Sequence, residues 1–280
     1  MLGAFVTLLR EAFEASLLVA IVLAYLGRIG HKRGFRAVWY GVGAAVAVSL
    51  VASGVLFATA SELEGAAEEV FEGSAMLVAV AVLTYMVLWM RRESRTISGT
   101  LREGVDEAVR KGSAFALALL VFTMVLREGI ETGLFVFGIA QTSTPVQVAV
   151  GAGAGLAAAV ALGYAVYAGG RRINLGAFFK YTGALLILVA AGLLAQGVRA
   201  FEEAGVIPAI LYPLWDLTGA PVVGMDTAFS AVLGNIFGWD PKPDLLEFAA
   251  WAVYLVGVGY AFLKPHAAER TAPRTAQAGK

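Results

Sequence analysis

Residues 113–140 read SAFALALLVFTMVLREGIETGLFVFGIA and hold two conflicting signals. The stretch is longer than the roughly 20 mostly apolar residues that a helix needs to cross a bilayer. Near its middle, however, stand Arg127, Glu128 and Glu131. Each charge at the centre of a spanning helix costs about 2.5–3.5 kcal/mol on insertion scales, and such residues usually mark a functional site. We therefore predict a spanning helix that carries a buried polar site.

The composition of the whole chain also favours a membrane protein. Of its 280 residues, 59% are hydrophobic and only 15% are charged, whereas about a quarter of the residues in soluble domains are charged. The formal net charge is zero. No basic stripe alternates with aromatic residues, which argues against a nucleic-acid partner.

Cysteine and histidine usage limits the metal chemistry. The chain has no cysteine, and its two histidines, His31 and His266, lie outside the apolar segments. Disulfides, iron–sulfur clusters and thiolate metal sites are therefore excluded. A metal ion inside the membrane would meet mainly oxygen ligands, which suit hard cations. We expect neither a catalytic residue nor a permanently bound cofactor.

Seven segments are long and apolar enough to span a bilayer. We therefore predict an all-α, polytopic membrane protein with seven transmembrane helices. The segments run from Gly3 to Leu26, Ala37 to Ala60, Phe71 to Met90, Ser113 to Ala140, Val146 to Ala168, Ala177 to Gly197 and Leu245 to Leu263.

The charges of the connecting segments predict the orientation. Arginines and lysines follow the first, third, fifth and seventh segments, whereas the alternate loops are acidic or neutral. Because basic loops stay in the cytoplasm, we expect the N-terminus outside and the C-terminus in the cytoplasm. We predict a single permease domain over residues 1–264, with an outer loop at 199–244, a last span at 245–264 and a disordered cytoplasmic tail at 265–280.

An internal repeat links the first and fourth segments. Leu9-Arg10-Glu11 with Glu14 matches Leu126-Arg127-Glu128 with Glu131, at a spacing of 117 residues. The third and sixth segments align weakly, so we predict that residues 1–92 and 112–198 are two copies. Each copy has three spans, an odd number, so the second copy must be inverted in the membrane. Inverted repeats are typical of transporters that bind their substrate at the repeat interface.

The two motifs supply the candidate metal ligands. On a helix, residues three and four positions apart lie on one face, so each motif presents two carboxylates beside a guanidinium. Four glutamates and two arginines leave a charge of −2, which a multivalent cation would balance. The alternative is a structural network of buried ion pairs. The candidate ligands are Glu11, Glu14, Glu128, Glu131 and Glu72, with Arg10, Arg127, Glu68, Glu69 and Asp216 as accessory residues.

The accessory acids have simpler explanations too. Glu68 and Glu69 open the third span, where the helix dipole favours negative charge. Glu72 lies one turn deeper, and we expect it to help the cation to enter. Asp216 and Asp226, in the predicted outer loop, would collect cations or form a solvated loop.

At these residues the sequence resembles the high-affinity iron permease family, which includes fungal plasma-membrane and bacterial ferrous/ferric uptake permeases. Its hallmark is Arg-Glu-Gly-x-Glu in two spans; the copy at Arg127 fits fully, and the copy at Arg10 has alanine for glycine. The similarity covers most of the chain. Further matching stretches are Glu68–Gly73, Trp89–Arg92, Phe179–Gly183, Leu194–Gly197 and Trp215–Leu217.

The resemblance implies an iron-uptake permease of the cytoplasmic membrane, with iron as its substrate. It implies that Glu11, Glu14, Glu128 and Glu131 form part of the route. It also implies a partner outside the cytoplasm that oxidises or delivers iron.

Three alternatives to an iron-uptake permease remain. The substrate could be another divalent cation, such as manganese or lead. The chain could be a seven-span receptor with structural ion pairs, although a retinal protein would need a lysine inside the last span. An intramembrane di-iron oxidase would normally need Glu-x-x-His, and no apolar segment contains histidine.

Overall fold

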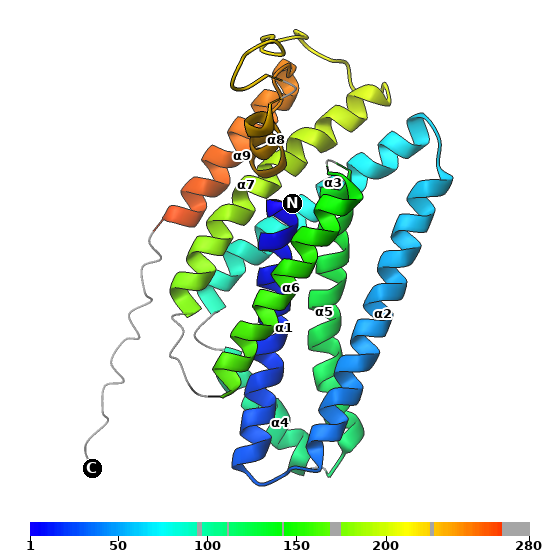
Figure 1. Cartoon of the computed structure of the whole chain (residues 1–280). Helices are drawn as coiled ribbons and strands as arrows, with labels where there is room; N and C mark the ends of the chain where they lie inside the picture. The colour runs from blue at the N-terminus through cyan, green and yellow to red at the C-terminus, as the bar shows by residue number, and fades with distance from the viewer. Residues whose placement is uncertain (94–96, 111, 142, 169–174, 225–226, 265–280) are drawn as a thin grey trace, which may run out of the picture.

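The computed structural model describes residues 1–93, 97–110, 112–141, 143–168, 175–224 and 227–264. This part of the chain is helical and contains no β-strand. The predicted disordered tail, residues 265–280, lies outside the described residues. The helices, labelled as in Figure 1, are α1 (Leu2–Arg28), α2 (Gly34–Glu62), α3 (Ala66–Glu93), α4 (Ile97–Arg110), α5 (Ala114–Ala140), α6 (Pro145–Tyr167), α7 (Leu175–Glu203), α8 (Ala228–Phe237) and α9 (Leu245–Leu263).

Five of these helices, α2, α3, α6, α7 and α9, are long and apolar enough to cross a membrane. The helices α1 and α5 are comparably long, at 27 residues each. They differ because each carries the three charged residues of a motif inside an otherwise apolar helix. The part of the chain that the structure describes is therefore all helical and fits a polytopic membrane protein.

Local sequence explains where several helices begin and end. The hydroxyl of Ser113 accepts a hydrogen bond from the backbone N–H of Ala116 at the start of α5, as expected of an N-cap serine. Gly30, between α1 and α2, and Gly65, between α2 and α3, have φ angles of 75° and 61°. Glycine adopts this left-handed conformation at little cost, so the chain can reverse direction in a few residues.

Three helix pairs that are distant in sequence pack along their lengths: α1 with α6, α2 with α5, and α3 with α7. Glycines allow the close approach. A Cβ added at Gly41 of α2 would lie 2.4 Å from the carbonyl oxygen of Ala118, and one at Gly151 of α6 would lie 2.2 Å from that of Met1. Ala118 follows Met1 by 117 residues, which is also the spacing of the two motifs, so both pairs pack in the same register.

Two short helices occupy segments in which no span is predicted, and they lie at opposite ends of the molecule (Figure 1). Val105 and Ala108 of α4 are buried in a cluster with residues of α1, α2 and α5. The helix α8 begins after Thr227, whose hydroxyl accepts a hydrogen bond from the N–H of Ser230, and ends at Gly238.

The last helix joins the α3–α7 pair. In α9, the hydroxyl of Tyr254 lies 2.7 Å from the Thr84 hydroxyl of α3, and Phe262 packs against Gly183 of α7. The two motif helices, α1 and α5, contact each other. In addition, α1 contacts α6 and α7, and α5 contacts α2 and α3.

Candidate metal centre

The first motif is buried in α1. Arg10, Glu11 and Glu14 are 1%, 0% and 4% exposed. The Nε of Arg10 lies 3.1 Å from Oε1 of Glu14, and its Nη1 lies 3.4 Å from Oε1 of Glu11. One guanidinium therefore faces two carboxylates, as the helical spacing predicts.

The second motif repeats these pairs on α5 but is less covered. The Nη2 of Arg127 lies 2.6 Å from Oε1 of Glu128, and its Nε lies 3.6 Å from Oε1 of Glu131. The Arg127 side chain is 49% exposed, and its guanidinium lies over the ring of Trp89, 5.6 Å from the centroid. The two arginines are thus equivalent in sequence and unequal in burial.

Three of the four motif glutamates converge. Glu11 of α1 and Glu128 and Glu131 of α5 each offer a carboxylate oxygen, and these oxygens lie within 4.8 Å of one another. The Oε2 atoms of all three are buried and have no hydrogen-bond partner among the described residues. Like charges so close repel each other, and carboxylate oxygens are preferred ligands of hard cations. The trio is therefore the part of the structure best suited to hold a metal ion.

Glu14 is not a member of this trio. Its carboxylate pairs with Arg10 on the same helix, although Glu128 and Glu131 lie within electrostatic range. The packing of α1 on α5 thus distinguishes two glutamates that the sequence treats as equivalent.

The outer acids lie apart from the trio. Glu68, Glu69 and Glu72 are partly buried near the start of α3, and Glu72 has a side-chain hydrogen bond with Gln141. Asp226 lies outside the described residues.

Asp216 lies on the loop between α7 and α8. It accepts hydrogen bonds from the hydroxyl of Thr218 at 2.6 Å and from its backbone N–H at 3.1 Å. These bonds, with the ammonium of Lys242 at 3.6 Å, hold the pKa of Asp216 below its usual range. Asp216 is thus an exposed, charged residue with partners of its own.

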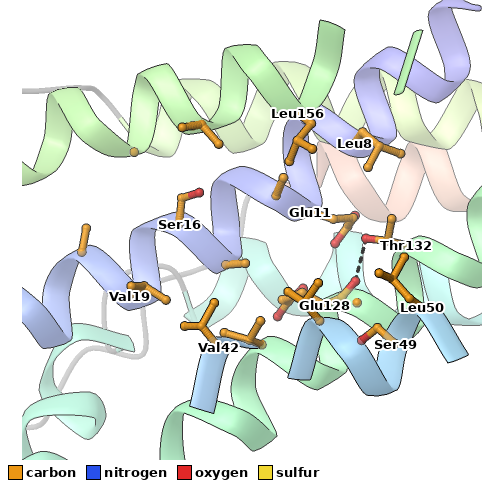
Figure 2. Close-up of a pocket in the computed structure, with 18 of the residues that line it drawn as sticks. Leu8, Glu11, Ser16, Val19, Val42, Ser49, Leu50, Glu128, Thr132 and Leu156 are labelled. Atoms are coloured by element: carbon orange, nitrogen blue, oxygen red, sulfur yellow. Dashed lines mark hydrogen bonds between the residues drawn. The ribbon is translucent and has the colours of Figure 1, made fainter. Parts of the chain in front are cut away.

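A cleft of about 830 Å³ leads to two of the trio residues. It lies between α1, α2, α5 and α6, and both Glu11 and Glu128 border it (Figure 2). Most other lining side chains are apolar, and several, such as Leu50 and Val160, are more than half exposed. Apolar cavities do not retain water, so in a bilayer this cleft suits lipid chains better than a hydrated ion.

Two residues near the trio were not predicted from the sequence. The position of Trp89 near the end of a span is typical of an interfacial aromatic, yet its ring lies under the Arg127 guanidinium. Ser49 of α2 borders the cleft beside Glu128 (Figure 2). Trp89 lies in a stretch that resembles the family, but neither residue belongs to the two charged motifs, and only the packing of α3 and α2 against α5 brings them to the site.

A second buried acidic pair lies at the start of α9. Asp244 and Glu247 are 2% and 4% exposed, and Asp244 accepts a hydrogen bond of 2.6 Å from the Glu247 backbone N–H. The pattern Asp-x-x-Glu before an apolar helix is a capping signal. Arg199 also pairs with the nearby Asp240. Helix capping thus explains the role of Asp244, and Asp240 is paired with Arg199.

Two comparisons with known proteins point to the same family. The profile of the iron permease FTR1 family matches residues 1–268. The chain is 38% identical over 274 residues to proteins named ferrous iron permease EfeU from Shigella sonnei and Escherichia coli O157:H7, with 97% of this chain and 99% of each relative covered. It is 34% identical over 263 residues to the protein of that name from Yersinia pestis, with 93% of each chain covered. No solved structure matches the chain.

Proposed function

Because this chain belongs to the iron permease FTR1 family, we propose that it carries iron through the carboxylate trio of Glu11, Glu128 and Glu131. The observation that carries this proposal is the convergence of three carboxylates whose Oε2 atoms are buried and unpartnered among the described residues. Membership of a permease family makes the chain a transporter rather than an enzyme, and iron is its substrate.

The trio would bind iron by replacing water in its coordination shell. Three carboxylates attract a cation strongly, and their mutual repulsion in the empty site adds to that attraction. Arg127 holds the Oε1 atom of Glu128 at 2.6 Å, which orients the carboxylate. Arg10 forms an ion pair with Glu14, with its Nε 3.1 Å from the Oε1 of Glu14. Glu14 is then the next oxygen ligand for an ion that leaves the trio.

The proposed membrane arrangement has seven spans. It adds α1 and α5 to the five apolar helices and treats α1–α3 and α5–α7 as inverted repeats, with α9 as the last span. The common register of the α1–α6 and α2–α5 pairs supports the repeat. The loop charges support an N-terminus outside and a C-terminus inside the cytoplasm.

Outer acids would serve as a collecting surface. Glu68, Glu69 and Glu72 lie near the start of α3 and Asp216 lies on the loop between α7 and α8, both on the side that the loop charges assign to the exterior. An extracytoplasmic protein that oxidises or delivers iron would release the ion there. The family membership removes the receptor alternative, whereas manganese and lead remain competing substrates to be measured.

Radioactive iron uptake into proteoliposomes tests the proposal. We expect uptake of iron, offered separately as Fe²⁺ and Fe³⁺, to exceed that of empty liposomes and to outcompete Mn²⁺ and Pb²⁺. The variant Glu131→Gln should reduce uptake by at least about 10–100-fold, since losing even an outer partner of a metal costs that much. Normal uptake by a folded Glu131→Gln variant would contradict a route through the trio.

A further inference from the structure

The hydroxyl of Ser49 on α2 is a buried polar group without a partner. Ser49 is 7% exposed, and its Oγ has no hydrogen bond to any described residue. Burying a hydroxyl without a hydrogen bond costs free energy. The cleft in front of Ser49 is mostly apolar and does not suit water. Among the other residues that border this cleft, Glu11 and Glu128 each have a buried carboxylate oxygen without a hydrogen bond among the described residues.

The contacts of Ser49 place it beside the second motif. A Cβ added at Gly129 would lie 2.0 Å from the Oγ of Ser49 and 2.7 Å from its Cβ. Gly129 directly follows Glu128, and Figure 2 shows Ser49 and Glu128 bordering the same part of the cleft. The glycine of the second Arg-Glu-Gly-x-Glu motif is thus the residue that admits the serine side chain.

The repeat shows that packing alone does not need this hydroxyl. The spacing of 117 residues matches Gly129 with Ala12, and the spacing of 110 residues between Gly41 and Gly151 matches Ser49 with Ala159. The first motif helix and its partner α6 therefore have two alanines where α5 and α2 have glycine and serine. Ala159 is fully buried, so an alanine packs well at this position.

We propose that Ser49 supplies an uncharged oxygen to the cation site beside Glu128, an inference that rests on the proposed iron function. When the ion is bound, a lone pair of Oγ faces it. In the structure, the Oγ of Ser49 and the Oε2 of Glu128 are both buried and have no hydrogen bond among the described residues. A neutral ligand adds coordination without adding to the repulsion among the three carboxylates.

The first test compares Ser49→Ala with Ser53→Ala in iron uptake. Ser53 is a matched control because it lies one turn further along α2 and meets Gly133 as Ser49 meets Gly129. We expect Ser49→Ala to raise KM by about tenfold or more with a smaller effect on the maximal rate, and Ser53→Ala to leave KM unchanged. Equal KM values for both variants and the unmodified protein would overturn the inference.

The variant Glu131→Gln separates this failure from failure of the proposed function. If Glu131→Gln abolishes uptake and Ser49→Ala does not change it, the trio stands and Ser49 has no role. If Glu131→Gln also transports normally, the proposed function itself is wrong.

A gain of binding gives a second readout that a packing role would not produce. The chain has no cysteine, so Ser49→Cys introduces a single thiol, and thiolates prefer soft metals. We expect Cd²⁺ to raise the melting temperature of Ser49→Cys more than that of Ser53→Cys. Equal shifts in both variants would contradict a position at the ion.

Discussion

At the scale of residues, the two motifs differ in what each glutamate does. Glu14 forms an ion pair with Arg10, which is almost completely buried, whereas Glu131 converges with Glu11 and Glu128. Arg127 retains Glu128 at 2.6 Å if Glu131 is lost. Substitutions of Glu14 and of Glu131 should therefore have different consequences, although the two residues occupy the same position in their motifs.

We expect Glu131→Gln to fold normally and to lose iron uptake, because it removes a carboxylate from a repelling trio. Glu14→Gln should lower the free energy of unfolding, because breaking a buried pair costs about 3–5 kcal/mol. The remaining contact of Arg10 with Glu11, at 3.4 Å, should keep the loss near the lower end of that range. Thermal unfolding in detergent and uptake in proteoliposomes measure the two effects. Equal stability losses in both variants would contradict the different roles.

At the scale of helices, glycines determine how closely the long pairs pack. A Cβ at Gly41 or at Gly155 would lie 2.4 Å or 2.5 Å from a backbone oxygen of the neighbouring helix. Such contacts cannot be relieved by turning a side chain, so the helices themselves would have to separate.

We expect Gly41→Ala and Gly155→Ala each to destabilise the protein by about 1–3 kcal/mol, the usual cost of overpacking. Gly43 and Gly153 are matched controls on the same helices, since a Cβ added at either would meet no atom within 4 Å. Alanine there should be neutral or stabilising, because it favours the helix by up to about 1 kcal/mol. The melting temperatures of the four variants measure these differences in stability. A stable Gly41→Ala variant would show that α2 and α5 do not pack as described.

At the scale of the whole molecule, the proposed inverted repeat requires the two ends of the helix bundle to face opposite sides of the membrane. Figure 1 shows α4 at the end opposite to the α2–α3 connection and the start of α6. The inverted arrangement therefore predicts which positions a reagent reaches from outside the cell.

We expect cysteines introduced at Ser61 and Gln147 to react with an impermeant thiol reagent in intact cells. Both residues are exposed, as is Glu103 of α4. A cysteine at Glu103 should react only after the membrane is permeabilised, because α4 would lie in the cytoplasm. Labelling of position 103 from outside would refute the orientation and, with it, the inverted repeat.

Much of this architecture follows from local patterns in the sequence. The apolar segments predict the long helices because a membrane demands about 20 apolar residues per span. The pairing of Arg10 with Glu14 and of Arg127 with Glu131 follows from helical spacing. The short helix α4 was not predicted, since it does not form an apolar run of spanning length.

The composition of the metal centre, in contrast, depends on how helices rotate and cross. Local spacing is the same for Glu14 and Glu131, yet only Glu131 joins the trio, because α1 and α5 present different faces to each other. The same packing leaves Arg10 1% exposed and Arg127 49% exposed, and it brings Ser49 against Gly129. These contacts join residues far apart in the chain, so no local pattern in the sequence encodes them, and the tertiary structure is needed to find them.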